Sequence, residues 1–267
     1  MRWTETNPAS RRGDRHVLAI GLLSDLHVHR HDQADAVKAL IRYIRSQPPP
    51  DVLVCAGDIS HRTGEIAAFL HQVDLCTQRY WIPGNHDVWV IDAESDSDSP
   101  EYRYSELFPC ISRDLDWRYL PSGPVVLPGT GIAIVGTIGW FTGRGYSEWF
   151  DSPAGEKDDL LAQRFAQDLR TQIQSLPSSL RLIVVTHHLS HRLSPSYDPG
   201  KRDTWSGHLE KVLTEFSSRI IVVIHGHRHV RYPPTRIDEF YFAAHPFGYP
   251  HQHAHAEDGY TVVPVEI

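Results

Sequence analysis

Short apolar runs rich in valine, isoleucine and leucine recur along the chain, each about as long as one β-strand. A run with little alternation between apolar and polar positions is typical of a strand that is buried on both faces of a sheet. The pattern therefore predicts five strands, at residues 17–25, 51–58, 79–87, 181–188 and 219–227.

Between several of these runs, apolar residues return every three or four positions, which is the spacing along one face of an α-helix. We expect helices around residues 36–44, 161–176 and 209–216. Strands that alternate with helices indicate an α/β fold. Other strand-like runs follow one another in pairs with no helix inside the pair, which favours a second, more antiparallel sheet. These runs are residues 124–128, 131–137, 237–244 and 259–267.

Two mixed sheets packed face to face, with helices outside, would account for all these elements, and this arrangement is a four-layer αββα sandwich. We expect a single domain over residues 1–267, with insertions near residues 92–112 and 140–159. The first insertion opens with an acidic, turn-rich stretch and is expected to begin as a solvated loop. The second carries five aromatic residues among glycines, and it could pack its own aromatic side chains or form a wall over a substrate pocket.

The composition is that of an ordinary globular protein: 40% of the 267 residues are hydrophobic and 22% are charged. The formal net charge is -7 and no long run of lysine and arginine occurs, which argues against a nucleic-acid-binding surface. Three scattered cysteines suit neither a disulfide framework nor a thiolate metal site, and they favour a reducing compartment. No apolar run approaches the roughly 20 residues of a membrane span, so we expect a cytoplasmic protein without membrane contact.

The 18 histidines are the unusual feature of the composition, and several of them follow the predicted strands. Because the carboxyl ends of strands in an α/β sheet share one edge, polar residues at these ends should meet in space. Any one of these short motifs is a weak signal, but five in order, each after a strand-like run, are not explained by chance. The motifs are Asp25-x-His27, Gly57-Asp58, Gly84-Asn85-His86-Asp87, His187-His188 and Gly226-His227-x-His229.

These five motifs resemble the signature of the calcineurin-like metallophosphoesterase superfamily, and their wording is most similar to its small phosphodiesterase branch. The resemblance implies an αββα sandwich and a pair of metal ions. It implies that one ion is held by Asp25, His27 and His229 and the other by Asn85, His187 and His227. It further implies that Asp58 bridges the two ions and that His86 lies beside the substrate without binding metal.

The ligand types are chemically consistent with this implication. Carboxylate, imidazole and amide groups without a thiolate suit Mn²⁺, iron, Zn²⁺ or Co²⁺, and the ligand set does not select one of them. Two such ions can share a hydroxide, which attacks phosphorus in line with the leaving group. Two divalent ions against Asp25, Asp58 and one hydroxide leave a charge of about +1, which favours an anionic substrate. His86 would then act as general acid for the leaving oxygen, beside the metal-bridging Asp58 as the other catalytic residue.

Some residues near the motifs stay open to more than one interpretation. His187 is aligned with the superfamily histidine in preference to His188, although the prolines usual in that stretch are missing. His29 and His31 could reach the rim of the pocket but are expected to be surface residues, and His61 with Arg62 could contact a phosphate. His225 is expected to be structural, and Asp87 could orient His86 or cap a turn. The histidine tract 251–255 could bind metal but is expected to be a loop that enters the last strand.

The leading functional hypothesis is hydrolysis of a phosphodiester in a small molecule or nucleotide. A phosphomonoesterase and a nuclease are the alternative enzymes, and a scaffold that keeps the fold without the chemistry is the alternative of another class. Ser60-His61-Arg62 does not reproduce the protein-phosphatase block Gly-Asp-x-x-Asp-Arg-Gly. A nuclease would need a basic track that the scattered arginines do not provide, and a scaffold relative would be expected to have lost ligands. The oligomeric state is not indicated.

Overall fold

Two β-sheets form the centre of the computed structural model, which describes residues 17–76, 78–91, 98–141, 156–200 and 205–266. The first sheet has five strands in the order β11-β1-β2-β3-β4 and the second has six in the order β5-β6-β7-β8-β10-β9. The strands of the first sheet are β1 (Val17–Leu23), β2 (Val52–Cys55), β3 (Arg79–Trp81), β4 (Arg118–Tyr119) and β11 (Thr261–Glu266). Those of the second are β5 (Val125–Leu127), β6 (Ile132–Thr137), β7 (Arg181–Thr186), β8 (Ile220–Ile224), β9 (Tyr232–Ile237) and β10 (Phe240–Ala244).

Both sheets are mixed. β1, β2, β3 and β4 run parallel and β11 joins β1 antiparallel, with Val17 opposite Glu266. In the second sheet β6, β7, β8 and β10 run parallel, while β5 and β9 are antiparallel edge strands. The parallel centre of each sheet therefore directs its carboxyl ends to one edge.

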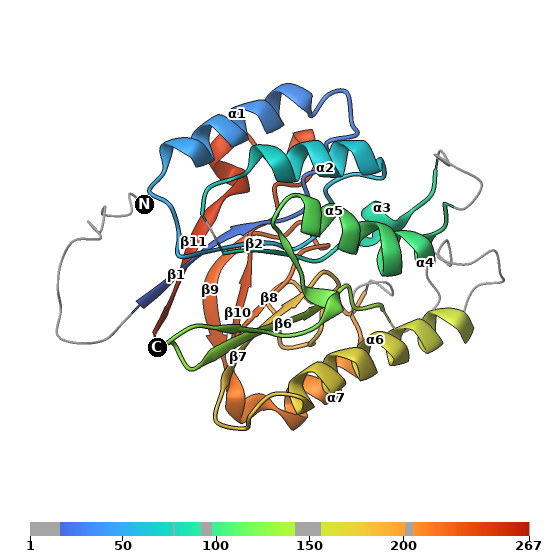
Figure 1. Ribbon diagram of the computed structural model, residues 1–267, viewed down its shortest axis with the longest axis vertical. Coiled ribbons are helices and arrows are strands. Elements are labelled where there is room, and N and C mark those ends of the chain that lie inside the picture. The colour runs from blue at the N-terminus through green and yellow to red at the C-terminus, as the bar shows by residue number, and fades with distance from the viewer. Residues whose placement is uncertain (1–16, 77, 92–97, 142–155, 201–204, 267) are drawn as a thin grey trace.

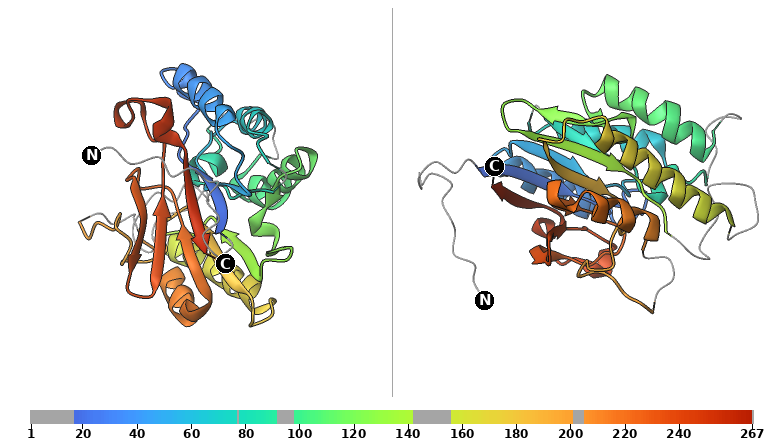
Figure 2. Two further views of the ribbon diagram at one scale, coloured as in Figure 1. Left: turned by 90° about the vertical axis from the view of Figure 1, so that its left-hand side faces the viewer. Right: turned by 90° about the horizontal axis from the view of Figure 1, so that it is seen from below.

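Helices cover the outer face of each sheet, which makes four layers (Figures 1 and 2). The first sheet is covered by α1 (Ala34–Ser46), α2 (Thr63–Gln72) and α5 (Phe108–Asp114), and the second by α6 (Glu156–Gln174) and α7 (Gly207–Glu215). α1 forms because its apolar positions recur at helical spacing and are all buried against the sheet. These positions are Val37, Leu40, Ile41 and Ile44.

Successive side chains along each strand point to opposite faces of the sheet, and this separates the core into three clusters. On β2, Val52 and Val54 point into the cluster between the two sheets, whereas Leu53 and Cys55 point to the helices. This is the period of two expected of a strand with both faces buried. The predicted αββα sandwich is confirmed, and the burial of apolar side chains in all three clusters fixes the sheets against each other.

Several boundaries differ from the prediction. The run 79–87 is a strand only to Trp81, and residues 85–88 form the short helix α3 (Asn85–Val88). β4 and β9 were not predicted, because two residues and a proline-bearing edge strand carry little apolar signal. Around the expected insertions, residues 92–97 and 142–155 lie outside the described part of the chain, so the wall over a pocket stays a prediction there.

The end of the first expected insertion is helical and packs on the core. α4 (Pro100–Tyr102), η1 (Arg103–Leu107) and α5 follow one another, and Arg103 and Phe108 are buried. The expected solvated loop therefore ends before Pro100. That residues 1–267 form one domain stays a prediction. In the described part of the chain, no helix combines the length and the apolar character needed to cross a membrane.

Candidate metal centre

The loops after five strands meet at one edge of the two sheets. The backbone N–H of Asp25, after β1, donates to Gly57 O at 2.8 Å, and that of Leu26 donates to Asp58 O at 2.8 Å. Within the second sheet, Gly226 N–H, after β8, donates to His187 O, after β7, at 3.2 Å. Across the two sheets, His227 N–H donates to Asp25 Oδ1 at 2.8 Å, so motifs about 200 residues apart are in contact. The strand ends thus converge as the parallel topology predicts.

The backbone of these loops is unusual at the candidate ligands. Five of them have a positive backbone φ, between 47° and 68°, and residues other than glycine rarely adopt this conformation. Each such residue costs about 1–3 kcal/mol and persists only where its surroundings hold it. Non-glycine strain of this kind is concentrated at this edge, since the described chain has only two further examples, Asp116 and Asp238. The five residues are Asp25, His27, Asp58, His227 and His229.

One group of ligand atoms gathers around His27. Its Nε2 lies 3.0 Å from Nε2 of His229 and 3.9 Å from Oδ2 of Asp58. His229 Nε2 lies 3.3 Å from Oδ1 of Asp25. One ligand atom from each of the four residues lies within 4.8 Å of the others, so these side chains could surround a single cation.

A second group shares Asp58 with the first. Asp58 Oδ2 lies 3.3 Å from Nε2 of His187, and one atom each of Asp58, His187 and His227 lies within 4.8 Å of the others. Asn85 completes this group, because its Oδ1 lies 3.2 Å from His187 Nε2 and 3.0 Å from His227 Nδ1. Two adjacent groups joined by one carboxylate are the arrangement expected of a dinuclear site.

The residues fit a pair of cations on chemical grounds. Two imidazole nitrogens 3.0 Å apart can form at most one hydrogen bond, but both can bind one metal ion. Oδ2 of Asp25 is buried and lacks a hydrogen-bond partner among the described residues. The second ring nitrogens of two histidines are already used, since His187 Nδ1 donates to Ala56 O at 2.8 Å and His229 Nδ1 donates to Gln252 Oε1 at 2.8 Å. These bonds leave Nε2 free for a metal, as the outer partners of metal-bound histidines do.

The electrostatics of the centre also favour cation binding. Burial raises the pKa of Asp58, but His187 and the neighbouring imidazoles outweigh burial and hold this pKa well below its ordinary range. Burial also raises the pKa of Asp25, but the hydrogen bond and the charge of His229 outweigh burial and lower this pKa to about 2. Burial lowers the pKa of His27 to about 3 and that of His227 to about 4. Both carboxylates are therefore ionised, and these two imidazoles keep a free lone pair at neutral pH.

A family model matches most of the chain: the model of the calcineurin-like phosphoesterases covers residues 18–231. The chain belongs to the calcineurin-like phosphoesterase family. Among curated proteins, this phosphoesterase is 33% identical over 76 residues to the acyl-carrier-protein phosphodiesterase PptH of Mycobacterium tuberculosis. That match covers 27% of this chain and 21% of the relative, so it spans about a fifth of the relative's length.

Solved structures of other proteins have the same fold as this phosphoesterase. The crystal structure of phosphopantetheinyl hydrolase PptH from Mycobacterium tuberculosis superposes with a TM-score of 0.68 at 18% identity, covering 88% of this chain and 90% of that one. A dimetal phosphatase from Danio rerio gives 0.52 at 13% identity, with 92% and 91% covered. A putative 5'-nucleotidase from Staphylococcus aureus gives 0.52 at 13% identity, with 86% and 48% covered. At these identities the likeness concerns the fold.

Asp87 organises the loops of the phosphoesterase centre. Its buried carboxylate accepts four backbone N–H groups, from Asp58 and Gly84 on Oδ2 and from Ile59 and Ser60 on Oδ1, at 2.7–2.8 Å. These bonds join the loop that carries Asp58 to the loop that carries Asn85. Asp87 was considered either to orient His86 or to cap a turn, and these bonds are those of a residue that caps a turn. The motif offered no signal for these four donors, because they belong to the backbone.

Glycines let the loops approach the carboxylates closely. A Cβ on Gly226 would lie 2.6 Å from Oδ2 of Asp25, and a Cβ on Gly84 would clash with Oδ1 of Asp58. Sequence reasoning missed two further positioning residues, Gln252 and Arg103. Gln252 accepts a hydrogen bond from His229. Arg103 is buried and donates to His61 O at 2.6 Å and to Trp89 O at 2.8 Å.

His86 lies beside the first ligand group. Its backbone N–H donates to Oδ1 of Asp58 at 2.8 Å, and its ring centroid lies 4.6 Å from that of His27 and 4.2 Å from that of Trp89. Burial lowers the pKa of His86. The ring is thus at the edge of the candidate centre, where it could face a substrate.

The remaining histidines are placed as follows. His188 is outside both ligand groups, with its ring against Trp140 and His227. His225 is held by Tyr232 OH at 2.6 Å, which agrees with a structural role.

His29, expected at the surface, lies half-buried with its ring centroid 4.3 Å from that of His61, whereas Arg62 pairs with Glu65 at 3.3 Å. In the tract 251–255, His253 stacks on Phe247, and no tract residue belongs to a metal group among the described residues.

Proposed function

We propose that this chain is a metal-dependent hydrolase of phosphodiesters whose seven ligands are those assigned above. The observation that carries the proposal is Asp58, whose carboxylate belongs to both ligand groups. A single shared carboxylate holds two cations close enough to act on one phosphate. Membership of the calcineurin-like phosphoesterase family supports the same activity.

The side chains have separate tasks in this proposal. When bound, the two ions supply a Lewis-acid site that binds phosphoryl oxygens and lowers the pKa of an attacking water. Asp25 and Asp58 contribute two negative charges against the four positive charges of two divalent ions. Asn85 is a neutral ligand, and an aspartate there would remove a further positive charge. The loaded site therefore keeps a net positive charge that attracts an anionic phosphate.

His86 is assigned to the leaving group. Its ring is partly exposed and lies 4.6 Å from the buried ring of His27, next to the candidate centre but outside the proposed ligand set. A ring nitrogen of His86 would donate its proton to the leaving oxygen as the phosphorus–oxygen bond breaks. General acid catalysis of this kind contributes about 10²- to 10⁴-fold.

A diester is preferred to a monoester because the relative that shares a 76-residue stretch is a phosphodiesterase by its printed name. That relative acts on an acyl carrier protein, so the phosphodiester of a carrier protein joins small-molecule and nucleotide diesters as a candidate substrate. Phosphomonoesters are the alternative, favoured by the similarity in fold to a dimetal phosphatase. Manganese is the proposed native metal and the cytoplasm the proposed location.

The test is a comparison of substrates on protein loaded with two equivalents of Mn²⁺. We expect hydrolysis of bis(p-nitrophenyl) phosphate at least about 10-fold faster, as kcat/KM, than hydrolysis of p-nitrophenyl phosphate, a difference of about 1.4 kcal/mol in the barrier. Holo-acyl carrier protein, assayed by the release of phosphopantetheine, tests the protein substrate. The Asp58→Asn variant is the control, because it weakens the shared ligand. Metal-loaded protein without activity on any of these esters would favour the scaffold, and salt-sensitive DNA binding would favour the nuclease.

A further inference from the structure

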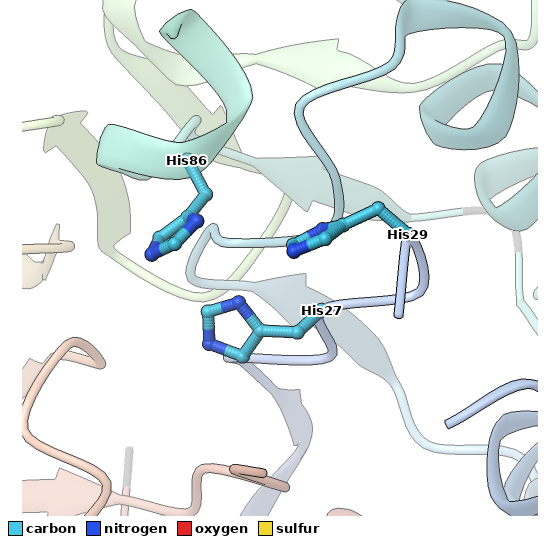
Figure 3. Close-up of side chains that lie close together, drawn as sticks. All are labelled: His27, His29 and His86. Atoms are coloured by element: carbon cyan, nitrogen blue, oxygen red, sulfur yellow. The ribbon is translucent and has the colours of Figure 1, made fainter. Parts of the chain in front are cut away.

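Three imidazole rings gather at one edge of the candidate dinuclear centre. One ring nitrogen from each of His27, His29 and His86 lies within 4.8 Å of the others. Figure 3 shows the three rings around one common space. His27 and His29 belong to the loop after β1, whereas His86 comes from α3, so the fold itself brings them together.

His27 differs from His187 and His229 in its second ring nitrogen. His187 and His229 donate through Nδ1 to an oxygen, as metal-bound histidines usually do. Nδ1 of His27 is buried and has no hydrogen-bond partner within the described part of the chain. In Figure 3 a nitrogen of this ring faces the space between His29 and His86. Nε2 of His27 is directed at His229 and Asp58, on the side of the dinuclear centre. Nδ1, on the other side of the ring, therefore remains available to a separate ligand.

The other two rings carry the same unsatisfied group. Nδ1 of His29 and Nδ1 of His86 are both buried, and neither has a hydrogen-bond partner among the residues that the structure describes. Buried polar atoms are nearly always paired, so an unpaired ring nitrogen on each of three adjacent rings indicates a missing ligand. No carboxylate belongs to this group of three. The missing ligand is therefore one that neutral imidazole nitrogens bind well.

We propose that His27, His29 and His86 form a third cation site, which takes Zn²⁺ and shares the His27 ring with the dinuclear centre. Zn²⁺ binds imidazole readily and is commonly four-coordinate, so three ring nitrogens leave one position open. Mn²⁺ prefers oxygen ligands and does not fill an all-imidazole site. On binding, Nδ1 of His27 releases its proton to solvent and forms a bond to the ion. Zinc–nitrogen bonds are about 2.0–2.1 Å, so the rings close in by side-chain rotation, which the partly exposed His29 and His86 permit.

The third ion would act as an inhibitor, a consequence that rests on the proposed function. An ion bound to His86 prevents this ring from donating its proton to a leaving oxygen. Excess Zn²⁺ should then lower kcat by about 10²- to 10⁴-fold on a diester with a poorly acidic alcohol as leaving group. It should change kcat little for a nitrophenol, which leaves without protonation.

The experiment counts bound ions and does not depend on activity. Metal-free protein is dialysed against excess Zn²⁺ or Mn²⁺, and the bound metal is measured by elemental analysis. We expect about three zinc ions or two manganese ions per wild-type chain. The variant His29→Gln should bind two zinc ions, and the control His31→Gln, which replaces an exposed histidine of the same loop, should bind three. Two zinc ions on the wild type, or three on His29→Gln, would overturn the proposal.

A spectroscopic measurement on the wild type keeps the test valid if His29→Gln does not fold. Co²⁺ replaces Zn²⁺, and the third equivalent should add the intense visible absorption of a four-coordinate ion. A third equivalent that adds no such band overturns the proposal. The third site and the proposed function can fail separately: active protein with two zinc ions removes only the third site, whereas inactive protein with three removes only the function.

Discussion

Replacing Asp87 by asparagine should weaken the centre without touching a metal ligand. The carboxylate of Asp87 accepts two backbone N–H groups on each oxygen, and these four bonds hold together the loops of Asp58 and Asn85. In asparagine one oxygen becomes an NH₂ group, so two of the four donors lose their acceptor and face another donor. Hydrogen bonds to a charged group contribute about 1.5–3 kcal/mol each, so the two lost bonds cost about 3–6 kcal/mol. Burial and the charge of Asp58 disfavour the ionised form of Asp87, and their relief in the neutral asparagine offsets part of this cost, so we expect a net loss of about 1–3 kcal/mol.

The loss is measured as the free energy of unfolding in urea for metal-free protein. Burial and the nearby Asp58 raise the pKa of Asp87 to about 7, so the measurement is made near pH 8.5, where Asp87 is ionised. The control is Asp35→Asn, which changes an exposed residue of α1 in the same way and should alter stability by less than about 0.5 kcal/mol. A loss below about 1 kcal/mol for Asp87→Asn would refute the view that its carboxylate holds the loops together.

Three further changes test other parts of the structure. Asp58→Asn should weaken binding of both metal ions, because both groups share this residue, and isothermal titration that found only one weakened site would contradict the bridge. His86→Gln should lower kcat by about 10²- to 10⁴-fold on a diester with a poor leaving group and much less on a nitrophenyl ester; equal losses would exclude proton donation. Burial lowers the pKa of His245 to about 4, so the folded protein binds fewer protons there than the unfolded chain, and stability is lost as pH falls from about 6.5 to 4. His245→Gln should remove up to about 3 kcal/mol of this loss, and an unchanged dependence of unfolding free energy on pH would contradict it.

The sequence predicted the layers and the position of the candidate site because both depend on strong local patterns. Apolar runs identify parallel strands, and their carboxyl ends share an edge, so residues as distant as Asp25 and His229 could be placed together before the structure was known. The distinction between His187 and His188 depended on resemblance, and the structure brings His187 into a ligand group while His188 stays outside both.

Other features depend on contacts that no local pattern records. The role of Asp87 comes from four backbone donors, and that of Gln252 from a bond to His229 across 23 residues. His29 was expected at the surface because it follows a motif in a polar loop, yet the path of this loop turns it toward His86. β9 was missed since its two prolines mask an edge strand that pairs only on one side. Tertiary placement outweighs local propensity in each of these cases.

The central claim is that Asp58 joins two cations. Crystals grown with Mn²⁺ and measured at the manganese absorption edge test it directly, because anomalous scattering locates each ion. We expect two peaks about 3.5–4 Å apart, with the Asp58 carboxylate between them. One should lie against His27 and His229, and the other against His187 and Asn85. A single peak, or two peaks of which one does not contact Asp58, would contradict the account.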